Sequence, residues 1–416
     1  MQNDEGLLSV AAARERCTAG VSELGTEPVA LVESLWRVLA EPIVAEAPVP
    51  PFANSGMDGY ALRAADVRGA SRAQPASLRV LADVTAGSVS PVPVMPGTAV
   101  RIMTGAPMPN GADAVVPVES TDEWPRADRA LLPEVVQVYR AVAPGEFVRP
   151  AGQDMRAGEE LLAPGRVLRA QDLGVLVAAG YAQVRVRRRP RVAVLSTGDE
   201  LVDAGQPLGP GQIRSTNGYT VAALVREAWG EALSLGIVRD DESEVRARLR
   251  AGLAAGADLF VTSAGVSVGT RDVVRGAVEA EGALGFWRVN MRPGKPVAFG
   301  RVGSVPFVGL PGNPVSAMVT FELFVRPMLL KMGGRHGGER TRVRARLEAP
   351  LSSDGRESYL RAVVRCEDDG YHAALTGDQG SGLLMSMVKA NALLVVPAGV
   401  TEVATEATLE AILLGE

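Results

Sequence analysis

The fold of the middle of this chain is decided by residues 288–321, RVNMRPGKPVAFGRVGSVPFVGLPGNPVSAMVTF. The segments VAFGR and VPFVGL predict two short strands on either side of a glycine turn. The segment PGNP then predicts a turn, with Asn313 as the N-cap of a helix and Pro314 as its first residue. The helix is expected to end at Gly333. A strand therefore leads through a tight turn into the start of a helix.

The same stretch is a positive island in a chain whose formal net charge is −5. No Asp or Glu occurs between Glu281 and Glu322. Its cations are Arg288, Arg292, Lys295 and Arg301. Free N–H groups and the helix dipole make a helix N-terminus a place where anions bind. An ordinary turn with solvated cations would show the same pattern, so the stretch alone leaves both alternatives open.

Length and composition indicate a globular protein of two to four domains. The chain has 416 residues, of which 47% are apolar and 22% charged, as is usual for soluble domains. The mildly acidic balance argues against extensive nucleic-acid binding and fits a small anionic ligand better. No signal peptide and no run of about 18 apolar residues is present, so we expect a cytoplasmic protein without membrane spans.

Cysteine and histidine content limits the metal sites that this chain could form. Cys17 and Cys366 lie far apart, which argues against a disulfide framework or a thiolate cage. The two histidines, His336 and His372, occur in loop or edge contexts. Any metal is therefore expected to be a hard cation bound by oxygen.

Along the chain, the patterns change character several times. Residues 7–40 are predicted to be helical in two segments, LLSVAAARERC and EPVALVESLWRVLAEPI. Residues 61–150 predict a small β-rich module, and 151–182 predict two glycine turns followed by a helix. Residues 190–335 alternate strands with helices, which is typical of a doubly wound, mostly parallel sheet. Residues 337–416 predict a compact β domain.

Polar residues follow the predicted strands of the α/β part, at the edge where such sheets bind ligands. They are Ser196–Glu200, Asp240-Asp241, the loop Ser263–Gly269 with Asp272 after it, and Pro311–Asn313. Each one alone fits an ordinary loop or helix cap. Together they suit one anionic ligand and a hard cation. Outside this part, the spacing around Asp58 and Thr104 predicts turns.

Eight motifs in order resemble the MoeA family of molybdopterin molybdenumtransferases and its relative, the gephyrin E domain. They are NSGMDGYA, RIMTGAPMPNGADAVVP, RPAGQDMRAGE, STGDELV, IRSTNGY, TSAGVSVGTRD, RPGKPVAFG and GLPGNPVSA. The resemblance covers nearly the whole chain. It implies a homodimeric enzyme that takes adenylylated molybdopterin and molybdate, cleaves the adenylate with a divalent cation, usually Mg²⁺, and releases molybdenum cofactor and AMP.

The resemblance also implies roles for individual residues. The catalytic residues are Asp58, Thr104, Asp154, Glu200, Asp241 and Asp272. Of these, Glu200, Asp241 and Asp272 would bind the metal. The substrate-binding residues are Ser263, Gly265, Ser267, Gly269, Arg288, Arg292, Lys295, Pro311, Gly312, Asn313 and Ser316. Molybdate is expected near Thr104 and neighbouring N–H groups. Ala264, Val273, Arg288 and Arg292 depart from the residues that the family usually shows.

The architecture that the resemblance implies has four parts in an elongated, L-shaped subunit. Residues 7–50 and 151–183 would form one discontinuous domain, and the β-rich domain 51–150 would be inserted into it. The α/β domain 184–335 resembles the molybdopterin adenylyltransferase fold, and 336–416 would form a C-terminal β domain. The active site is expected between the α/β domain of one subunit and the β module of the other.

Two other functions stay open at this point. One is an adenylyltransferase-like enzyme acting on molybdopterin, although that fold lacks the β module. The other is a non-catalytic scaffold, as the gephyrin E domain also clusters receptors. Molybdopterin adenylyltransferase and proteins that mature molybdoenzymes are expected partners. The sequence does not distinguish molybdate from tungstate.

Overall fold

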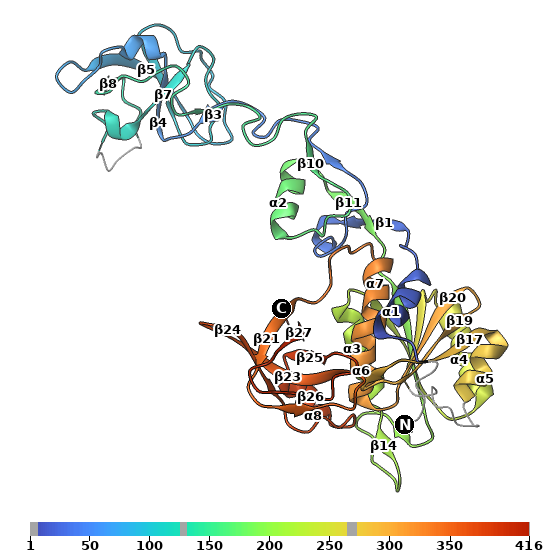
Figure 1. Ribbon diagram of the computed structural model, residues 1–416. Coiled ribbons are helices and arrows are strands. Elements are labelled where there is room, and N and C mark those ends of the chain that lie inside the picture. Colours follow the sequence, from blue (N-terminus) through green and yellow to red (C-terminus); the bar gives the residue numbers. More distant parts are fainter. Residues whose placement is uncertain (1–6, 125–130, 264–272, 416) are drawn as a thin grey trace. The chain divides into compact units, whose positions relative to one another are not determined.

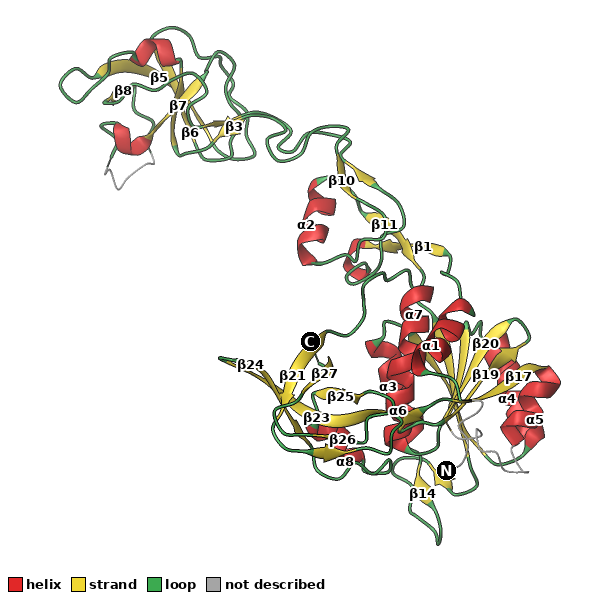
Figure 2. Ribbon diagram, viewed as in Figure 1, coloured by secondary structure: helices red, strands yellow, loops and turns green. Residues whose placement is uncertain are grey.

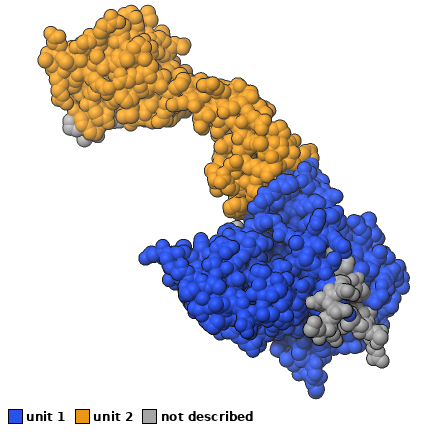
Figure 3. All heavy atoms as spheres, viewed as in Figure 1, with its two compact units in different colours: residues 1–27, 186–416 blue, residues 28–185 orange. Residues whose placement is uncertain are grey.

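The computed structural model describes residues 7–124, 131–263 and 273–415, with backbone alone for residues 286 and 287. It divides into two compact units, each described here by itself (Figure 3). One unit comprises Met1–Glu27 and Val186–Glu416, and the other comprises Pro28–Arg185. None of the helices within the described ranges is both long and apolar enough to cross a membrane.

The first unit contains the α/β domain that the sequence predicts. Its sheet has the strand order β15-β12-β16-β20-β19-β17. The first four strands are parallel, and β19 and β17 are antiparallel to their neighbours. One strand that the sequence did not predict is β17. The strands are β12 (Arg191–Thr197), β15 (Glu231–Val238), β16 (Leu259–Ser263), β17 (Gly282–Arg288), β19 (Pro296–Val302) and β20 (Val305–Leu310).

Helices cover both faces of this sheet (Figure 2). Val192 and Val194 share a core with α3 (Thr216–Glu227), whereas Ala193 and Leu195 share another core with α4 (Glu242–Ala254) and α5 (Val273–Glu281). Alternate residues of one strand thus face opposite layers, as strand geometry requires. The prediction of a doubly wound, mostly parallel sheet is confirmed.

One continuous helical segment follows β20. It consists of α6 (Pro314–Thr320), a π-helical turn (Phe321–Val325) and α7 (Arg326–Met332), and it packs against α1 (Val10–Ala19). Asn313 occupies the predicted N-cap position, but its side chain makes no capping hydrogen bond. Its Nδ2 instead donates to Ser381 Oγ at 3.0 Å. The predicted N-cap position and helix start are confirmed.

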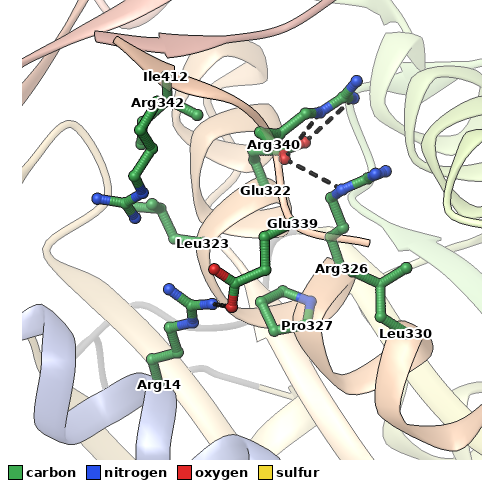
Figure 4. A pocket seen from close by; sticks show the side chains of 10 residues that line it. All are labelled: Arg14, Glu322, Leu323, Arg326, Pro327, Leu330, Glu339, Arg340, Arg342 and Ile412. Carbon is green, nitrogen blue, oxygen red and sulfur yellow. Dashed lines mark hydrogen bonds and ion pairs between the residues drawn. The ribbon is translucent and has the colours of Figure 1, made fainter. Parts of the chain in front are cut away.

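The π-helical turn carries a buried ion cluster (Figure 4). The Glu322 side chain is 7% exposed, and its Oε1 lies 3.3 Å from Arg326 Nε and 3.1 Å from Arg340 Nε. Arg340 immediately precedes the C-terminal β domain, so Glu322 ties that domain to the long helix. Beside this cluster, Arg14 of α1 pairs with Glu339.

Replacing Glu322 by Ala should lower the free energy of unfolding by about 3–5 kcal/mol, because two guanidinium groups then lose their buried partner. Urea denaturation monitored by circular dichroism measures this change. The matched control is Glu339→Ala, which removes a 63% exposed carboxylate paired with an arginine and should cost less than about 1 kcal/mol. Equal losses in both variants would show that burial does not set the strength of these pairs.

The C-terminal β domain closes on itself. Strands pair in the circle β23-β24-β21-β27-β25 and back to β23, with β18 added beside β23. The predicted compact β domain is thus a small barrel. Its elements are β18 (Met291–Arg292), β21 (Arg342–Leu347), β22 (Leu351–Ser352), β23 (Glu357–Glu367), β24 (Gly370–Leu375), α8 (Leu384–Lys389), β25 (Ala392–Val396), β26 (Glu402–Val403) and β27 (Thr408–Leu413).

In a small region of short strands and one helix, the structure differs from the prediction for the first part of the chain. The segment predicted as a second helix forms strand β1 and a 3₁₀ turn (Leu31–Glu33). Pro28 cannot donate a helical hydrogen bond, and β1 pairs with a strand from far along the chain, β11. The region's elements are β1 (Thr26–Ala30), β2 (Ile43–Val44), β10 (Glu160–Leu162), α2 (Ala170–Ala178) and β11 (Gln183–Arg187).

The β module is a five-stranded sheet of order β7-β4-β6-β5-β8. Tyr60 and Leu62 of β4 belong to the core on one face, and Ala61 belongs to the core on the other. The prediction of a β-rich module is confirmed. Strands β3 and β9 form a separate pair beside this sheet in the sequence of the module. The strands of the module are β3 (Asn54–Ser55), β4 (Gly59–Leu62), β5 (Ala76–Val84), β6 (Thr98–Ile102), β7 (Ala114–Pro117), β8 (Val135–Val138) and β9 (Val148–Arg149).

Candidate functional site

The carboxyl ends of four parallel strands lie side by side in the α/β domain. Thr197 of β12 is level with Val238 of β15, and Ser196 is level with Ser263 of β16, which is in turn level with Leu310 of β20. With neighbouring strands about 4.8 Å apart, this edge is about 14 Å across. An edge of that width can accommodate an extended ligand.

A buried hydrogen bond marks the point where the sheet's connections diverge. From β12 the chain continues to β15 on one side, and from β16 it continues toward β17 on the other. Ser196 Oγ and Ser263 Oγ lie 3.1 Å apart between these two strands. Ligands of open α/β sheets bind at such a switch point. Ser263 is therefore placed where a substrate-binding residue is expected.

Carboxylates gather at the β15 side of this edge, in a group that we name the acidic corner: Asp199, Glu200 and Asp240. The N–H of Asp240 donates to Asp199 Oδ1 at 3.3 Å. Partial burial, followed by the charges of Asp199 and Glu200, raises the pKa of Asp240 above the ordinary aspartate range. Gly198 has φ +150°, and a Cβ there would lie 2.6 Å from the Glu200 carboxylate. The backbone conformation at this position, which side chains rarely adopt, favours glycine.

Asp241 occupies a different environment from the acidic corner. It is the N-cap of α4, and its Oδ1 accepts from the N–H of Glu244 at 3.0 Å and from Ser243 Oγ at 2.5 Å. These hydrogen bonds, that of Ser243 first, lower the pKa of Asp241. The sequence analysis selected Asp241 over its neighbour, but the structure places Asp240 with Asp199 and Glu200.

Several of the predicted residues belong to the stretch of sequence that follows β16. The predicted residues Gly265, Ser267, Gly269 and Asp272, and the departure Ala264, lie outside the described residues. Their roles stay predictions. Val273, the other departure in this region, is the first residue of α5.

The turn after β20 is held from two sides. Asn217, in the first turn of α3, donates from Nδ2 to the Gly312 carbonyl at 2.7 Å. The Ser381 carbonyl accepts the N–H of Val315 at 3.1 Å. One backbone N–H at the start of α6 is thus already hydrogen-bonded. An anion bound at this turn would therefore need more side-chain donors than the sequence analysis expected. Pro311 and Ser316 are buried here.

Cations converge near this turn, in a group that we name the cationic end: Arg292, Lys295 and Arg361. Strand β18 pairs Arg292 with Ser358 of the barrel. Arg361 lies three residues further along the same barrel strand, is 1% exposed, and donates from Nε to Ser386 Oγ at 3.1 Å and from Nη2 to the Gly380 carbonyl at 3.1 Å. Burial, and then the charge of Arg292, lowers the pKa of Arg361.

Lys295 reaches this group through a tight turn. Gly294 has φ +106°, and a Cβ there would lie 2.5 Å from Thr320 Oγ1 of α6. The turn therefore packs directly on the helix, with Lys295 half-buried beside it. Arg288, at the end of β17, is exposed.

Sequence analysis missed Arg361. The available signal was an arginine inside the otherwise apolar strand segment YLRAVV, a position where a charge is rarely tolerated without a specific partner.

A second group of predicted residues comes together in the β module. The N–H and the hydroxyl of Thr104 both donate to Asp58 Oδ1, each at 2.8 Å. The two residues are 46 positions apart in sequence. The prediction that each lies in a turn gave no reason to pair them. Asp154 lies in an exposed turn, and its backbone N–H donates to the Val49 carbonyl at 3.0 Å.

One further cluster of charged side chains includes a histidine. Glu367, Asp369 and His372, on the β23–β24 hairpin, have ligand atoms within 4.8 Å of one another, and within the described ranges this is the one such group of three. His372 Nε2 lies 2.7 Å from Asp369 Oδ1, and Arg346 pairs with the same carboxylate at 2.9 Å. The side chains of Asp369, His372 and Arg346 are therefore already paired with one another.

Three family models match the chain in succession. They are the MoeA N-terminal region (domain I and II) over residues 8–180, the probable molybdopterin binding domain over 193–331, and the MoeA C-terminal region (domain IV) over 344–414. The chain belongs to the MoeA family.

Curated relatives of this MoeA-family chain share one description. A molybdopterin molybdenumtransferase of Nostoc sp. (strain PCC 7120) is 40% identical over 91% of this chain and 87% of its own length. Molybdopterin molybdenumtransferase 2 of Mycobacterium tuberculosis is 39% identical over 92% of this chain and 93% of its own. The crystal structure of a molybdopterin biosynthesis MoeA protein from Pyrococcus horikoshii matches with a TM-score of 0.82 and 32% identity, over 99% of this chain and 100% of that one.

These matches confirm the resemblance on which the prediction of function was based. The prediction of a molybdopterin molybdenumtransferase acting in molybdenum cofactor biosynthesis is confirmed. The predicted roles of single residues in this MoeA-family chain, and its predicted domain boundaries, stay predictions.

Proposed function

We propose that this protein inserts molybdenum from molybdate into adenylylated molybdopterin, with Mg²⁺-dependent cleavage of the adenylate and release of molybdenum cofactor and AMP. The observation that carries this proposal is the division of charge along one sheet edge. The acidic corner lies at β12 and β15, and the turn that follows β20 leads to the cationic end. A ligand with a phosphate chain and a bound cation needs both.

The acidic corner fits Mg²⁺. Its donors are carboxylate oxygens, the ligands that Mg²⁺ prefers, and their crowding already raises the pKa of Asp240. Among the described residues these carboxylates do not bring three ligand atoms within 4.8 Å, which suits an ion that keeps several waters. Glu200 and Asp240 would hold it, with Asp272 as the third predicted ligand. A bound Mg²⁺ would neutralise charge on the pyrophosphate.

The cationic end fits the oxyanions of the substrates. Arg292, whose exposed guanidinium lies 3.7 Å from Asp354 Oδ2, can turn to donate to phosphate or molybdate oxygens, and half-buried Lys295 adds a point charge. Arg361 is 1% exposed and already donates to Ser386 and Gly380, so it would act on the anion through its charge and not by direct contact. The sequence analysis expected molybdate near Thr104. In the structure the hydroxyl and the N–H of Thr104 both donate to Asp58, so we now place molybdate at the cationic end.

The test of this function is AMP release. Purified protein is mixed with adenylylated molybdopterin, molybdate and Mg²⁺, and AMP is quantified by chromatography. The proposal predicts AMP release that requires both Mg²⁺ and molybdate. Binding of the substrate without AMP release would favour a non-catalytic scaffold. Synthesis of adenylylated molybdopterin from ATP and molybdopterin would favour an adenylyltransferase.

Replacing Lys295 by Ala should weaken substrate binding roughly ten- to a hundred-fold, because loss of one charged hydrogen bond costs about 1.5–3 kcal/mol. Isothermal titration with substrate measures this. The matched control is Arg301→Ala. Arg301 belongs to the same cationic stretch but lies level with Pro306, near the start of β20 and so toward the opposite edge of the sheet, and its loss should leave affinity unchanged. Equal affinities in the wild type and in Lys295→Ala would show that Lys295 is a solvated surface charge.

The raised pKa of Asp240 predicts that Mg²⁺ affinity falls on acidification. A carboxyl with a raised pKa takes up its proton at a pH where an ordinary aspartate is still charged, so this ligand is lost first as the pH falls from neutrality toward the ordinary aspartate range. Titration calorimetry across this range should show a steeper fall in the wild type than in Asp240→Asn. Parallel curves would contradict the role of Asp240.

The raised pKa of Asp240 also predicts how the Asp240→Asn substitution affects stability. A carboxyl whose pKa is raised in the folded state opposes folding once it is deprotonated, so its contribution to stability is lost as the pH rises through that pKa. Asp240→Asn should therefore melt no lower than the wild type at neutral pH. A loss of Mg²⁺ affinity in this variant is then a loss of ligand and not of structure.

A further inference from the structure

Asn217 links the two helices that begin at the ligand-binding edge of the α/β sheet, α3 and α6. It belongs to the motif IRSTNGY, none of whose residues the resemblance assigned a role, and it lies within the residues matched by the probable molybdopterin binding domain. A Cβ at Gly218, the next residue, would lie 3.1 Å from Ser196 Oγ. The first turn of α3 therefore packs directly on the switch point of the sheet.

The side-chain amide of Asn217 has one satisfied end and one unsatisfied end. Its Nδ2 donates to the Gly312 carbonyl at 2.7 Å, within the turn that is predicted to bind substrate. Its Oδ1 is buried and has no hydrogen-bond partner among the described residues. A flipped amide would set Oδ1 against the Gly312 carbonyl, acceptor against acceptor. The bond to Gly312 thus fixes the oxygen as the end that is left over.

This oxygen needs a hydrogen-bond donor. Most buried side-chain polar atoms are bonded, and an exception indicates a missing water, ion or ligand. Phosphate and molybdate oxygens are themselves acceptors, so they are repelled. A Mg²⁺ ion would be drawn to the carboxylates of the acidic corner and not to one neutral oxygen. A substrate group that meets Asn217 Oδ1 must therefore carry an N–H or O–H.

We propose that Asn217 Oδ1 accepts a hydrogen bond from an exocyclic amino group of the substrate, an inference that rests on the proposed function and adds a specificity-determining residue to its site. Adenylylated molybdopterin has two such groups, the 2-amino group of the pterin and the 6-amino group of the adenine. Each only donates, because its nitrogen lone pair is delocalised into the ring. Each therefore suits an oxygen that only accepts.

The position of Asn217 suits this contact. Its half-buried side chain lies beside the turn that follows β20, over the edge where ligands of open α/β sheets bind. A ring with a carbonyl oxygen in place of the amino group would set two acceptors against each other there. Sites built to bond an N–H reject analogues that lack it, because the buried partner is left unpaired.

Two pairs of small probes test the inference on the full chain. Pterin and lumazine differ in having an amino group or an oxygen at position 2, and AMP and IMP differ in the same way at position 6. Fluorescence titration measures the first pair, and titration calorimetry measures the second. The wild type should bind the amino member of one pair about three- to tenfold more tightly, the effect of one hydrogen bond. That pair identifies the ring that Asn217 contacts.

Variants at Asn217 assign this preference to the oxygen. Asn217→Ala should abolish the preference, whereas Asn217→Asp, which keeps an acceptor and loses the donor to Gly312, should retain it. A wild type without a preference in either pair overturns the inference whatever the variants do. A preference that is unchanged in Asn217→Ala also overturns it, and leaves a buried water as the partner of Oδ1.

The matched control loosens the same turn from its other side. Ser381 Oγ accepts from Asn313 Nδ2 at 3.0 Å, so Ser381→Ala weakens the hold on the turn but leaves Asn217 intact. This variant should keep the preference for the amino probe. A loss as complete as in Asn217→Ala would show that the firmness of the turn sets the preference, and it would overturn the proposed contact.

The AMP-release assay on the same preparations separates this inference from the proposed function. Wild-type protein that releases AMP but shows no preference dependent on Asn217 keeps the function and loses the contact. Wild-type protein that prefers an amino probe through Asn217 but releases no AMP keeps the contact and loses the transferase reaction.

Discussion

AMP release should fall about a hundred-fold or more in Glu200→Gln, Asp240→Asn and Asp272→Asn, each measured at saturating substrate. Each amide keeps the size of the side chain but removes a negative oxygen from the predicted Mg²⁺ site, where charge stabilisation contributes several kcal/mol to the barrier. Quantifying AMP by chromatography at several Mg²⁺ concentrations measures the loss. Excess Mg²⁺ should restore part of the activity if the defect is in metal binding.

Asp241→Asn is the matched control, and it decides between neighbouring residues. Asn caps a helix as well as Asp does, so this variant should keep α4 intact and, by the geometry of the acidic corner, should retain more activity than Asp240→Asn. The opposite order would support the ligand set that the family resemblance implies. Full activity in all four variants would remove the metal site from this edge of the sheet.

Mixing two inactive variants should restore about a quarter of wild-type activity. Asp58 lies in one compact unit and Asp272 in the sequence of the other, and we propose that they complete one site across a homodimer. In a mixed dimer of Asp58→Ala and Asp272→Ala, one site collects both lesions and the other collects neither. With random assortment half of the dimers are mixed, and half of their sites are intact, if sites act independently.

Subunit exchange must be shown independently for this experiment, by mass spectrometry of chains that carry different tags. If Asp58 and Asp272 serve the site of the same chain, every site in the mixture carries a lesion. No recovery of activity despite proven exchange would therefore refute the shared site, while leaving the chemistry of the acidic corner untouched.

Most elements of the α/β domain were predictable because they have a local signal, whereas β17 was not predicted. Glycine turns separate apolar strands from helices, and the alternation of strands with helices predicts a mostly parallel sheet. The positions of Ser196, Glu200 and Asn313 at one sheet edge followed directly, since parallel strands place their carboxyl ends together.

What the sequence did not predict depends on where distant segments meet or on where a helix begins. The second predicted helix became β1 because pairing with β11, from far along the chain, outweighed an apolar pattern of helical period. Asp240 and Asp241 are adjacent and chemically alike, and only the start of α4 decides which one caps the helix. Arg361 joins Arg292 because β18 pairs with β23, a contact between segments that are distant in sequence.

In the β module, too, contacts between segments that are distant in sequence could not be predicted. Asp58 and Thr104 each fit an ordinary turn, and their hydrogen bonds arise only when β4 and β6 pair in the sheet.

The central claim is that one reaction couples adenylate cleavage to molybdenum transfer. The direct measurement is a single reaction of the wild type with adenylylated molybdopterin, molybdate and Mg²⁺, in which AMP and the molybdenum cofactor delivered to a cofactor-free molybdoenzyme are both counted. The account predicts equal amounts of the two products and neither one when molybdate is omitted. AMP formed at the same rate without molybdate, with no active molybdoenzyme, would show a simple hydrolase and would contradict the account.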